Sequence, residues 1–517
     1  MRIGEKNTVT MIPQLIPSSR CLACDVCCRF PEQDSPLAPY FTAEEIRRAI
    51  ERGVPQERFS GPKGGRIELI PHPNGEGYIC PAFDPTVNGC RIYDHRPLDC
   101  QLFPLALMWD PNKKTVLLGY DRKCPVVLES LFSEALFEYG RSMAARLETD
   151  GTIQTLRAHS GLIGAYQDDV MILTPLTRLT EALTGRPIEN GARPSPEAVG
   201  LTALTDADRP LFESTLNWTR TELSIYSWPA LMVWKDHLQY YWTIIDRQFC
   251  LFARYVGGLF MPLPPMGEKL TPEAVRHCFD RMDAMNNHPS ISRIENLDGE
   301  QVPVFEAMGL VIKPKEQEYL YDREALARLA GDRYKGKRWA CNRFVRDHRD
   351  EPVRLEPYRS SDRDDCLALF DRWKKQQAES GSFPNQREED RMMLEDAASA
   401  HRRALEYFTV LGLTGRVVRL GGKIVGYTFG YPFRPGVFCV LLEVADREVA
   451  GLSAYLYREF CRELSDYATI HAMDDSGLER LRAAKLSYHP SKILTSYIAT
   501  RPERSVVNSD RVRRSYK

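Results

Sequence analysis

The sequence predicts an α+β protein in which a cysteine-rich metal-binding domain precedes two mixed α/β domains in tandem. Eight of the 14 cysteines lie in the first quarter of the 517 residues. Glycines and prolines then alternate with polar residues around position 190, and helical and strand-like patterns alternate from there to residue 500. A chain of this length favours two to four domains. We expect a cysteine-cluster domain with closing helices at 1–184, a linker at 185–199, two halves of the mixed region at 200–350 and 351–500, and a basic tail at 501–517.

The composition is that of an ordinary globular protein, with 43% hydrophobic and 27% charged residues. The net charge of −1 gives no overall attraction to nucleic acid or to a membrane surface. Apolar runs such as Leu102–Trp109 are far shorter than the roughly 20 residues that cross a bilayer, so we expect no transmembrane segment. Residues 1–20 lack the apolar core of a secretory signal. We therefore expect a cytoplasmic protein.

Four cysteines stand within eight residues near the start of the chain, and four more follow. In a cytoplasmic protein such a cluster favours metal binding over disulfides. Thiolates select zinc or iron–sulfur centres, and eight of them could hold two zinc ions or one [4Fe–4S] cluster with thiols to spare. The predicted metal ligands are Cys21, Cys24, Cys27, Cys28, Cys80, Cys90, Cys100 and Cys124. The six scattered cysteines are expected to be inert and buried.

The later cysteines stand in the motifs Cys80-Pro-Ala-Phe, Cys90-Arg-Ile-Tyr-Asp-His-Arg-Pro and Cys100-Gln-Leu-Phe-Pro. Together with the CxxCxxCC start, these motifs resemble the cysteine-cluster family of zinc- or iron-chelating domains, which includes the flagellin lysine methylases. The resemblance covers about residues 18–128 and implies a metal site. His95, inside the second motif, is a further candidate to bind the metal or to orient a ligand.

Hydrophobic periodicity predicts the secondary-structure elements along the chain. In the first part we expect helices at 42–53, 126–148 and 168–183 and a strand at 66–70. After the linker we expect strands at 240–245, 249–256 and 290–296 and helices at 271–284, 322–330 and 335–350. The last part is expected to have helices at 361–378, up to 408, at 453–464 and at 477–484, with strands at 416–420, 423–431, 437–444, 469–472 and 493–500.

This order, two helices, a three-stranded meander, then helix, strand, helix and strand, is typical of the N-acetyltransferase fold. Residues 200–317 are interpreted as a diverged copy. Several segments, Glu318–Glu324, Tyr334–Phe344, Arg403–Leu413 and Asp475–Pro490, resemble the soluble C-terminal domain of phosphatidylglycerol lysyltransferases. The resemblance covers about residues 200–500. It implies two such folds in tandem that move an aminoacyl group from tRNA to an acceptor.

Acyl transfer from an ester needs cations for the donor's phosphates, a base for the attacking group and dipoles for the oxyanion. The candidate catalytic residues are Glu443 and Asp475, and the candidate substrate-binding residues are Lys337, Arg338, Asn342, Arg482 and Lys485. The structural alternative for the cations is a solvated helix face. We also expect Asp475 to cap a helix that starts at Gly477.

Some residues depart from the family pattern. Trp339 and His471 stand where asparagines are expected, and the glycine-rich pyrophosphate loop of CoA-dependent acetyltransferases is reduced to Gly451, which argues against acetyl-CoA as donor. With these departures, the resemblance implies a bacterial acyltransferase with an aminoacyl-tRNA donor, an unknown acceptor and, at most, peripheral contact with a membrane, and we expect the metal site of the first domain to be structural or regulatory. In the alternative, the metal centre is the active or redox part and the C-terminal fold is a non-catalytic binding module.

Overall fold

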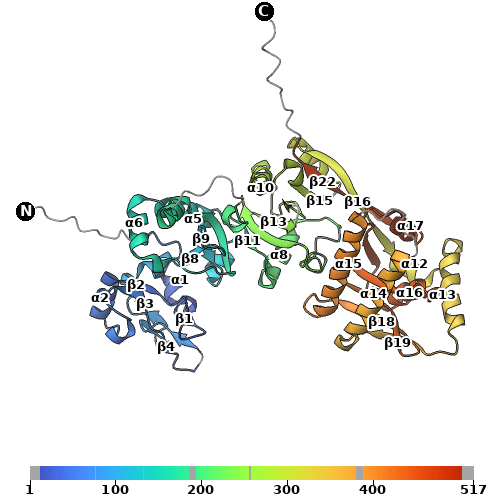
Figure 1. Cartoon of the computed structure of the whole chain (residues 1–517), viewed down its shortest axis with the longest axis horizontal. Coiled ribbons are helices and arrows are strands. Elements are labelled where there is room, and N and C mark those ends of the chain that lie inside the picture. Colours follow the sequence, from blue (N-terminus) through green and yellow to red (C-terminus); the bar gives the residue numbers. More distant parts are fainter. Residues whose placement is uncertain are drawn as a thin grey trace, which may run out of the picture. The chain divides into compact units, whose positions relative to one another are not determined.

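The computed structural model describes residues 12–75, 77–131, 133–185, 194–255, 258–379 and 388–502 (Figure 1). Most of the expected linker (186–193) and of the expected basic tail (503–517) lies outside these residues. The chain divides into two compact units. Unit 1 consists of residues 1–205, 241–250 and 273–285, and unit 2 consists of residues 206–240, 251–272 and 286–517.

The first part of unit 1 is built from short elements around a small apolar core. Its elements are α1 (Ser18–Leu22), β1 (Arg29–Phe30), β2 (Tyr40–Thr42), α2 (Ala43–Glu51), β3 (Gly64–Arg66), β4 (Ile70–Pro71), β5 (Tyr78–Ile79), β6 (Phe83–Asp84), β7 (Gly89–Cys90) and α3 (Leu98–Leu102). Thr42 and Glu45 form a capping box, so α2 begins where the sequence predicts it. The single strand expected at 66–70 is wrong, because residues 67–69 separate β3 from β4.

The second part of unit 1 contains a three-stranded sheet with the order β10-β9-β8, together with helices and two strands outside that sheet. Its elements are β8 (Leu105–Trp109), β9 (Val116–Asp121), α4 (Pro125–Glu129), α5 (Glu134–Leu147), α6 (Asp150–Ala158), β10 (Val170–Pro175), α7 (Thr177–Thr184), β11 (Thr202–Ala203), β12 (Gln239–Ile245) and α10 (Pro272–Met285). The helix expected at 168–183 is wrong in its first half. Val170, Met171 and Ile172 are consecutive buried residues, a run that suits a strand as well as a buried helix, and here they pair with β9.

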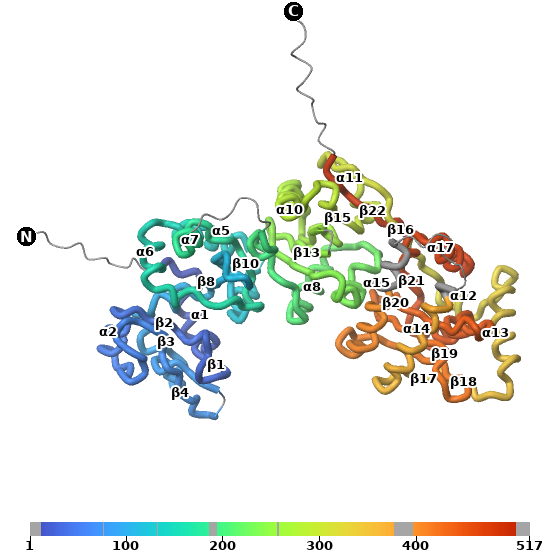
Figure 2. Tube along the Cα trace, viewed as in Figure 1, coloured from blue at the N-terminus to red at the C-terminus, as the bar shows by residue number. Residues whose placement is uncertain are grey.

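Unit 2 contains an eight-stranded sheet with the order β15-β22-β16-β21-β20-β19-β18-β17 (Figures 1 and 2). Its strands are β15 (Arg293–Leu297), β16 (Val311–Asp322), β17 (Val353–Pro357), β18 (Thr414–Leu420), β19 (Lys423–Arg434), β20 (Val437–Ala445), β21 (Thr469–Asp474) and β22 (Lys492–Thr500). Both expected halves of the mixed region contribute strands to this one sheet. The remaining elements are α8 (Arg209–Thr215), α9 (Trp228–Met232), β13 (Gln248–Tyr255), β14 (Gly258–Phe260), α11 (Val302–Ala307), α12 (Arg323–Arg328), α13 (Lys335–Asp347), α14 (Arg363–Glu379), α15 (Glu388–Glu406), α16 (Leu452–Glu463) and α17 (Glu479–Leu486).

The meander β18-β19-β20 follows from its turn residues and its alternating side chains. Gly421 and Gly422 have φ values of +55° and +87°, as a tight hairpin between β18 and β19 requires. Gly426 faces Leu456 of α16, whereas the hydroxyl of the next residue, Tyr427, lies 2.8 Å from His401 Nδ1 of α15. Successive strand residues point to opposite faces, so α16 and α15 cover opposite faces of the sheet.

Strands β20 and β21 are parallel, but they pair only between Val437–Cys439 and Thr469–His471. Beyond Cys439 the two strands separate, and among the described strands none pairs with the carboxyl end of β20 on that side. The element order and this arrangement confirm the predicted fold class, α+β with mixed α/β domains of the N-acetyltransferase type.

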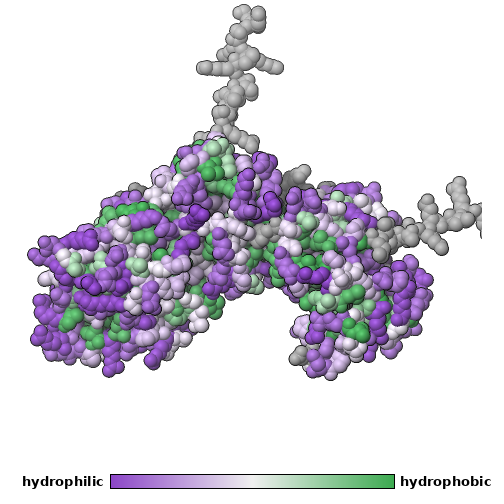
Figure 3. Space-filling model, turned by 180° about the vertical axis from the view of Figure 1, so that it is seen from behind, coloured by the Kyte–Doolittle hydropathy of each residue, from purple (hydrophilic) through white to green (hydrophobic). Residues whose placement is uncertain are grey.

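Hydrophilic residues cover much of the face of the molecule seen in Figure 3, and hydrophobic residues show there as separate patches. Among the described residues, no helix combines the length and the apolar character that crossing a membrane requires.

Candidate functional site

The eight predicted metal ligands of unit 1 line one cavity of about 200 Å³, which we call the cysteine cavity. They reach it from separate elements: α1 and the turn after it, a short 3₁₀ helix at Val26–Cys28, the segments after β5 and at β7, helix α3, and the start of α4. Tyr93 and Arg96 line the same cavity, with the Arg96 guanidinium 3.8 Å from the Tyr93 ring centroid. His95 is exposed and is not among the lining residues.

The donor chemistry of the cysteine cavity fits zinc or iron. Burial raises the pKa of the Cys80 thiol to about 12 and raises that of Cys100 as well. A hydrogen bond from Cys28 lowers the pKa of Cys27. Eight thiols gathered around one cavity, those of Cys80 and Cys124 buried, are what a thiolate-preferring cation would bind with loss of protons. In the described part of the chain, no three Cys, His, Asp or Glu side chains are already spaced as ligands of a single ion.

The other cysteines behave as their scattered positions predict. All six are buried, and the sulfur atoms of Cys250 and Cys278 lie 3.5 Å apart.

Unit 2 has a pocket of about 900 Å³ beside the carboxyl end of β20, where β20 and β21 have separated. We call it the β20 pocket. It is lined by the first turns of α13 and α16, the loop between β20 and α16, and the residues that follow α17. Two of the predicted site residues, Lys337 and Glu443, meet here.

One carboxylate oxygen of Glu443 has no hydrogen-bond partner in the part of the chain that the structure describes. Oε1 accepts a hydrogen bond of 3.0 Å from Ser453 Oγ, whereas Oε2 is buried and has no hydrogen-bond partner among the described residues. Burial raises the pKa of Glu443 to about 7, although the hydrogen bond from Ser453 and the charge of Lys337 oppose this. A carboxyl group with a pKa near neutrality can accept and return a proton at physiological pH.

Lys337 faces the same pocket from the first turn of α13. Its Nζ lies 3.8 Å from the centre of the Tyr488 ring. Burial lowers the pKa of this lysine, and the nearby Cys341 and Glu443 partly oppose that shift. The ammonium therefore lies in a weakly solvated position, where its field on a bound anion is stronger than in water.

Gly451 is the one glycine in the segment where CoA-dependent acetyltransferases have a glycine-rich loop, and the structure gives it a packing role. It has φ +81° and precedes α16, and a Cβ at this position would lie 2.1 Å from the carbonyl oxygen of Ala340. The glycine thus lets the first turn of α16 approach α13, so that the amino ends of both helices border the β20 pocket.

The remaining predicted residues lie elsewhere in unit 2. Asp475 is fully buried and accepts hydrogen bonds from Tyr319 Oη (2.6 Å), Arg482 Nε (2.9 Å) and the Gly477 backbone N–H (3.1 Å). Burial alone would raise the pKa of Asp475, but these donors outweigh it and lower the pKa. The predicted capping role is wrong, because α17 begins only at Glu479 and Asp475 instead holds the preceding turn.

Lys485, Arg338 and Asn342 have different surroundings. Lys485 Nζ donates to the carbonyl oxygens of Ala472 and Asp474, and burial lowers its pKa. Arg338 donates to the carbonyl oxygens of Leu329 and Gly331, just beyond α12, and Asn342 is exposed on α13. The structure therefore brings together Lys337 with Glu443, and separately Asp475 with Arg482 and Lys485.

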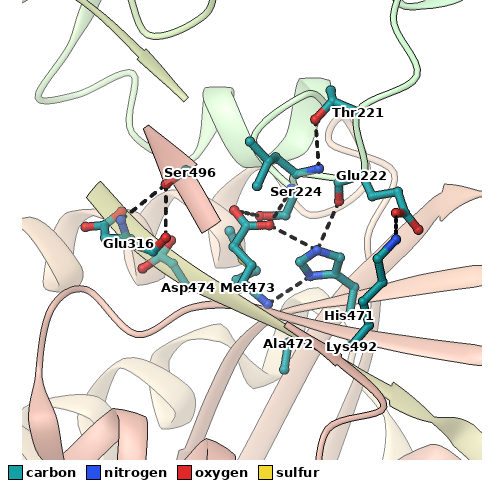
Figure 4. A network of polar contacts seen from close by, with 12 residues as sticks. Thr221, Glu222, Ser224, Glu316, His471, Ala472, Met473, Asp474, Lys492 and Ser496 are labelled. Carbon is teal, nitrogen blue, oxygen red and sulfur yellow. Dashed lines mark hydrogen bonds and ion pairs between the residues drawn. The ribbon is translucent and has the colours of Figure 1, made fainter. Parts of the chain in front are cut away.

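Sequence reasoning missed a buried polar network in unit 2 (Figure 4). The Glu318 carboxylate accepts hydrogen bonds from the backbone N–H (2.8 Å) and the hydroxyl (3.0 Å) of Ser224, and its Oε2 lies 3.0 Å from His471 Nε2. All three side chains are almost fully buried. Ser224 and His471 lie 94 and 153 positions from Glu318 in the sequence, so no spacing rule could have paired them. The one sequence signal was His471, which stands where the family pattern predicts an asparagine.

His471 is subject to opposing influences. Burial lowers the pKa of His471, but Cys439 and Glu318 outweigh it and raise that pKa to about 10. The Met473 backbone N–H, however, donates to His471 Nδ1 at 3.0 Å, which favours a ring that carries its proton on Nε2. Since Met473 itself has φ +57°, the strand is locally distorted to make this contact.

Family models match two separate parts of the chain. A family model described as "Phosphatidylglycerol lysyltransferase, C-terminal" matches residues 220–500, and one described as "Putative zinc- or iron-chelating domain" matches residues 20–125. No curated protein matches the chain.

Solved structures similar to this chain include three bacterial proteins. A conserved protein of unknown function from Bacteroides thetaiotaomicron is 25% identical with a TM-score of 0.50, over 58% of this chain and 99% of its own. The C-terminal domain of a "Putative Lysylphosphatidylglycerol Synthetase" from Agrobacterium fabrum is 14% identical (TM-score 0.41; 58% and 93% covered), and L-PGS from Bacillus licheniformis is 15% identical (TM-score 0.39; 62% and 95% covered).

The first family model spans more than half of the residues, including every strand of the eight-stranded sheet and the whole β20 pocket. The chain therefore belongs to the phosphatidylglycerol lysyltransferase C-terminal family, and it carries a zinc- or iron-chelating cysteine domain at its amino-terminal end.

Proposed function

We propose that unit 2 is an aminoacyltransferase that moves an aminoacyl group from an aminoacyl-tRNA to a nucleophilic acceptor, with Glu443 as the general base. The observation that carries this proposal is the buried, unpartnered Oε2 of Glu443 at the β20 pocket. Burying a carboxylate oxygen without a hydrogen-bond partner costs free energy of folding. A role as a proton acceptor would explain why such a group is retained.

In the proposed reaction, Glu443 both accepts and returns the transferred proton. The acceptor's hydroxyl or amino group attacks the ester carbonyl of the donor, and its proton passes to Glu443 as the new bond to carbon forms. The tetrahedral oxyanion then collapses, the bond to the ribose oxygen breaks, and Glu443 returns the proton to that oxygen. Glu443 ends the cycle as it began, and a pKa of about 7 suits both transfers.

The cations and dipoles of the same pocket suit the donor's negative charge. Lys337 and Arg333 line it, and the amino ends of α13 and α16 add their positive helix ends. We assign Lys337 to the oxyanion or to the nearest donor phosphate, because it lines the same pocket as Glu443 and its charge acts on that carboxylate. Asp475, whose oxygens are already occupied by three donors, is assigned a positioning role together with Arg482 and Lys485.

The test uses the full-length protein and tRNA charged with radiolabelled amino acids, incubated with lipid, peptide and small-molecule extracts in turn. Label should leave the tRNA and appear in one acceptor fraction. Glu443→Gln should lower this rate by about 10² to 10⁴, the usual contribution of a general base. Glu300→Gln, at an exposed glutamate of the same unit, is the matched control. Transfer by Glu443→Gln at the wild-type rate would refute the assignment.

We also propose that the cysteine cavity holds the metal of unit 1, either zinc or iron. The convergence of eight thiols on one cavity supports this. When bound, such a metal would supply structural cross-links or, as an iron–sulfur cluster, electron transfer. Metal analysis and a visible spectrum of anaerobically purified protein distinguish these cases. Brown protein with iron and sulfide would indicate a cluster, and colourless protein with stoichiometric zinc would indicate a structural site.

A further inference from the structure

One face of helix α13 exposes an aromatic side chain together with polar and charged side chains. The residues Lys335, Trp339, Asn342 and Arg346 recur at helical spacing, so they form one stripe along the helix, which we call the α13 stripe. Trp339 is 59% exposed, more than any other large apolar side chain among the described residues of unit 2. The opposite face of the helix is packed, with Cys341 and Phe344 fully buried. Tryptophan is enriched at binding interfaces, so an exposed tryptophan beside cations makes this face a candidate binding surface.

The charge of the stripe is positive. Lys335 and Arg346 belong to it, and Arg343 stands beside it with its guanidinium 5.5 Å from the Trp339 ring. Asp347 is the single acid of α13; it lies 3.2 Å from Arg343 and 3.0 Å from Arg346, so it holds both guanidinium groups near the surface and neutralises only part of their charge. The Arg346 side chain remains 63% exposed.

The stripe is continuous with the β20 pocket. Gly336, Lys337 and Ala340, on the neighbouring side of the same helix, line that pocket. α13 lies at the edge of unit 2 in Figure 2, and all four side chains of the stripe are exposed. A chain that lies along the stripe can therefore reach the pocket around the first turns of the helix.

We propose that the α13 stripe binds the single-stranded 3′ end of the donor tRNA, with a base stacked on Trp339 and backbone phosphates on Lys335, Arg343 and Arg346. This proposal rests on the proposed function and adds to it the surface that holds the RNA. Cations that follow the backbone, together with an aromatic ring that stacks a base, are the common elements of single-strand recognition. A membrane surface would need several exposed apolar side chains beside the charges, and α13 offers only Val345 in addition to Trp339.

The test measures the affinity of the full-length protein for a short fluorescent RNA hairpin with a single-stranded 3′ end, as a function of salt. Base stacking on an aromatic side chain is worth about 1 to 3 kcal/mol, so Trp339→Ala should weaken binding by about 5- to 150-fold, while Trp339→Phe should retain most of it. Arg346→Ala should weaken binding and make the salt dependence less steep by about one phosphate contact. Trp218→Ala and Arg354→Ala replace exposed residues of the same types elsewhere in unit 2 and should change neither quantity.

Three results would overturn the proposal: no RNA binding by the wild-type protein, unchanged binding by Trp339→Ala, or binding of anionic phosphatidylglycerol vesicles that Trp339→Ala abolishes while RNA binding persists. The two proposals fail separately. If Trp339→Ala binds RNA normally but Glu443→Gln loses transfer, the surface is wrong and the function stands. If Trp339→Ala loses RNA binding but Glu443→Gln transfers normally, the surface stands and the base assignment is wrong.

Discussion

Replacing Glu443 by glutamine should stabilise unit 2 at alkaline pH while it removes the proposed base. In the folded protein, burial raises the pKa of Glu443 from 4.5 to about 7. The folded state therefore binds this proton more tightly than the unfolded state. The contribution of Glu443 to stability is greatest below pH 4.5, falls as the pH rises from 4.5 to 7, and stays low above 7.

The size of the effect follows from the shift. Each pKa unit corresponds to 1.36 kcal/mol, so ionising Glu443 in the folded state costs about 3 kcal/mol above pH 7. Glutamine avoids this cost, and its amide oxygen can still accept the hydrogen bond from Ser453. Because the side chain is only partly buried, we expect a gain of about 2 to 3 kcal/mol at pH 8 and none at pH 4. For a unit of this size, that corresponds to a rise in Tm of about 4 to 6 °C.

The assay is thermal unfolding of the wild type, Glu443→Gln and the control Glu300→Gln at pH 4, 6 and 8. Hydrogen–deuterium exchange of β20 and α16 assigns the shift to unit 2. The transfer rate of the wild type should in parallel rise about tenfold between pH 6 and pH 8, as a base with a pKa of about 7 ionises. A variant that is less stable than the wild type at pH 8, or a transfer rate that is flat over this range, would refute the reasoning.

Three further outcomes are expected. Gly451→Ala should destabilise unit 2 by more than about 2 kcal/mol in urea unfolding, because its Cβ meets the Ala340 carbonyl, whereas Gly436→Ala, at φ +73° with no atom nearby, should cost only about 1 kcal/mol. Asp475→Asn should destabilise unit 2 by about 1 to 3 kcal/mol at pH 7. The pKa of Asp475 is lowered in the folded state, so its carboxylate stabilises the fold above pH 3.8, and the difference from the wild type should vanish as acid protonates it below that pH. An equal loss at all pH values would contradict this. Cys28→Ser should lower the metal content measured after purification, while Cys461→Ser, at a buried isolated cysteine, should leave it unchanged.

Local patterns predicted most of the elements of unit 2. The glycine pair at 421–422 indicated the hairpin, and the apolar face of α16 indicated a helix, because these signals act within one turn or one helix. The prediction failed at 168–183, where a run of apolar residues suits either element and the pairing with β9 decides. It also failed at Asp475, whose partners Tyr319 and Arg482 are set by packing.

The sequence by itself determined the fold class and the presence of a cysteine-cluster domain ahead of the mixed α/β region, because each of these depends on spacing along a short segment or on a recognisable motif. The assignment of the eight thiols as metal ligands stays a prediction. Only the tertiary structure decided which residues share a site. It joined Lys337 to Glu443 across more than a hundred residues, it buried Glu318 between Ser224 and His471, and it made Gly451 necessary through the approach of Ala340. Such contacts depend on how the strands separate and how the helices pack on the sheet, and residues far apart in sequence carry no local signal of them.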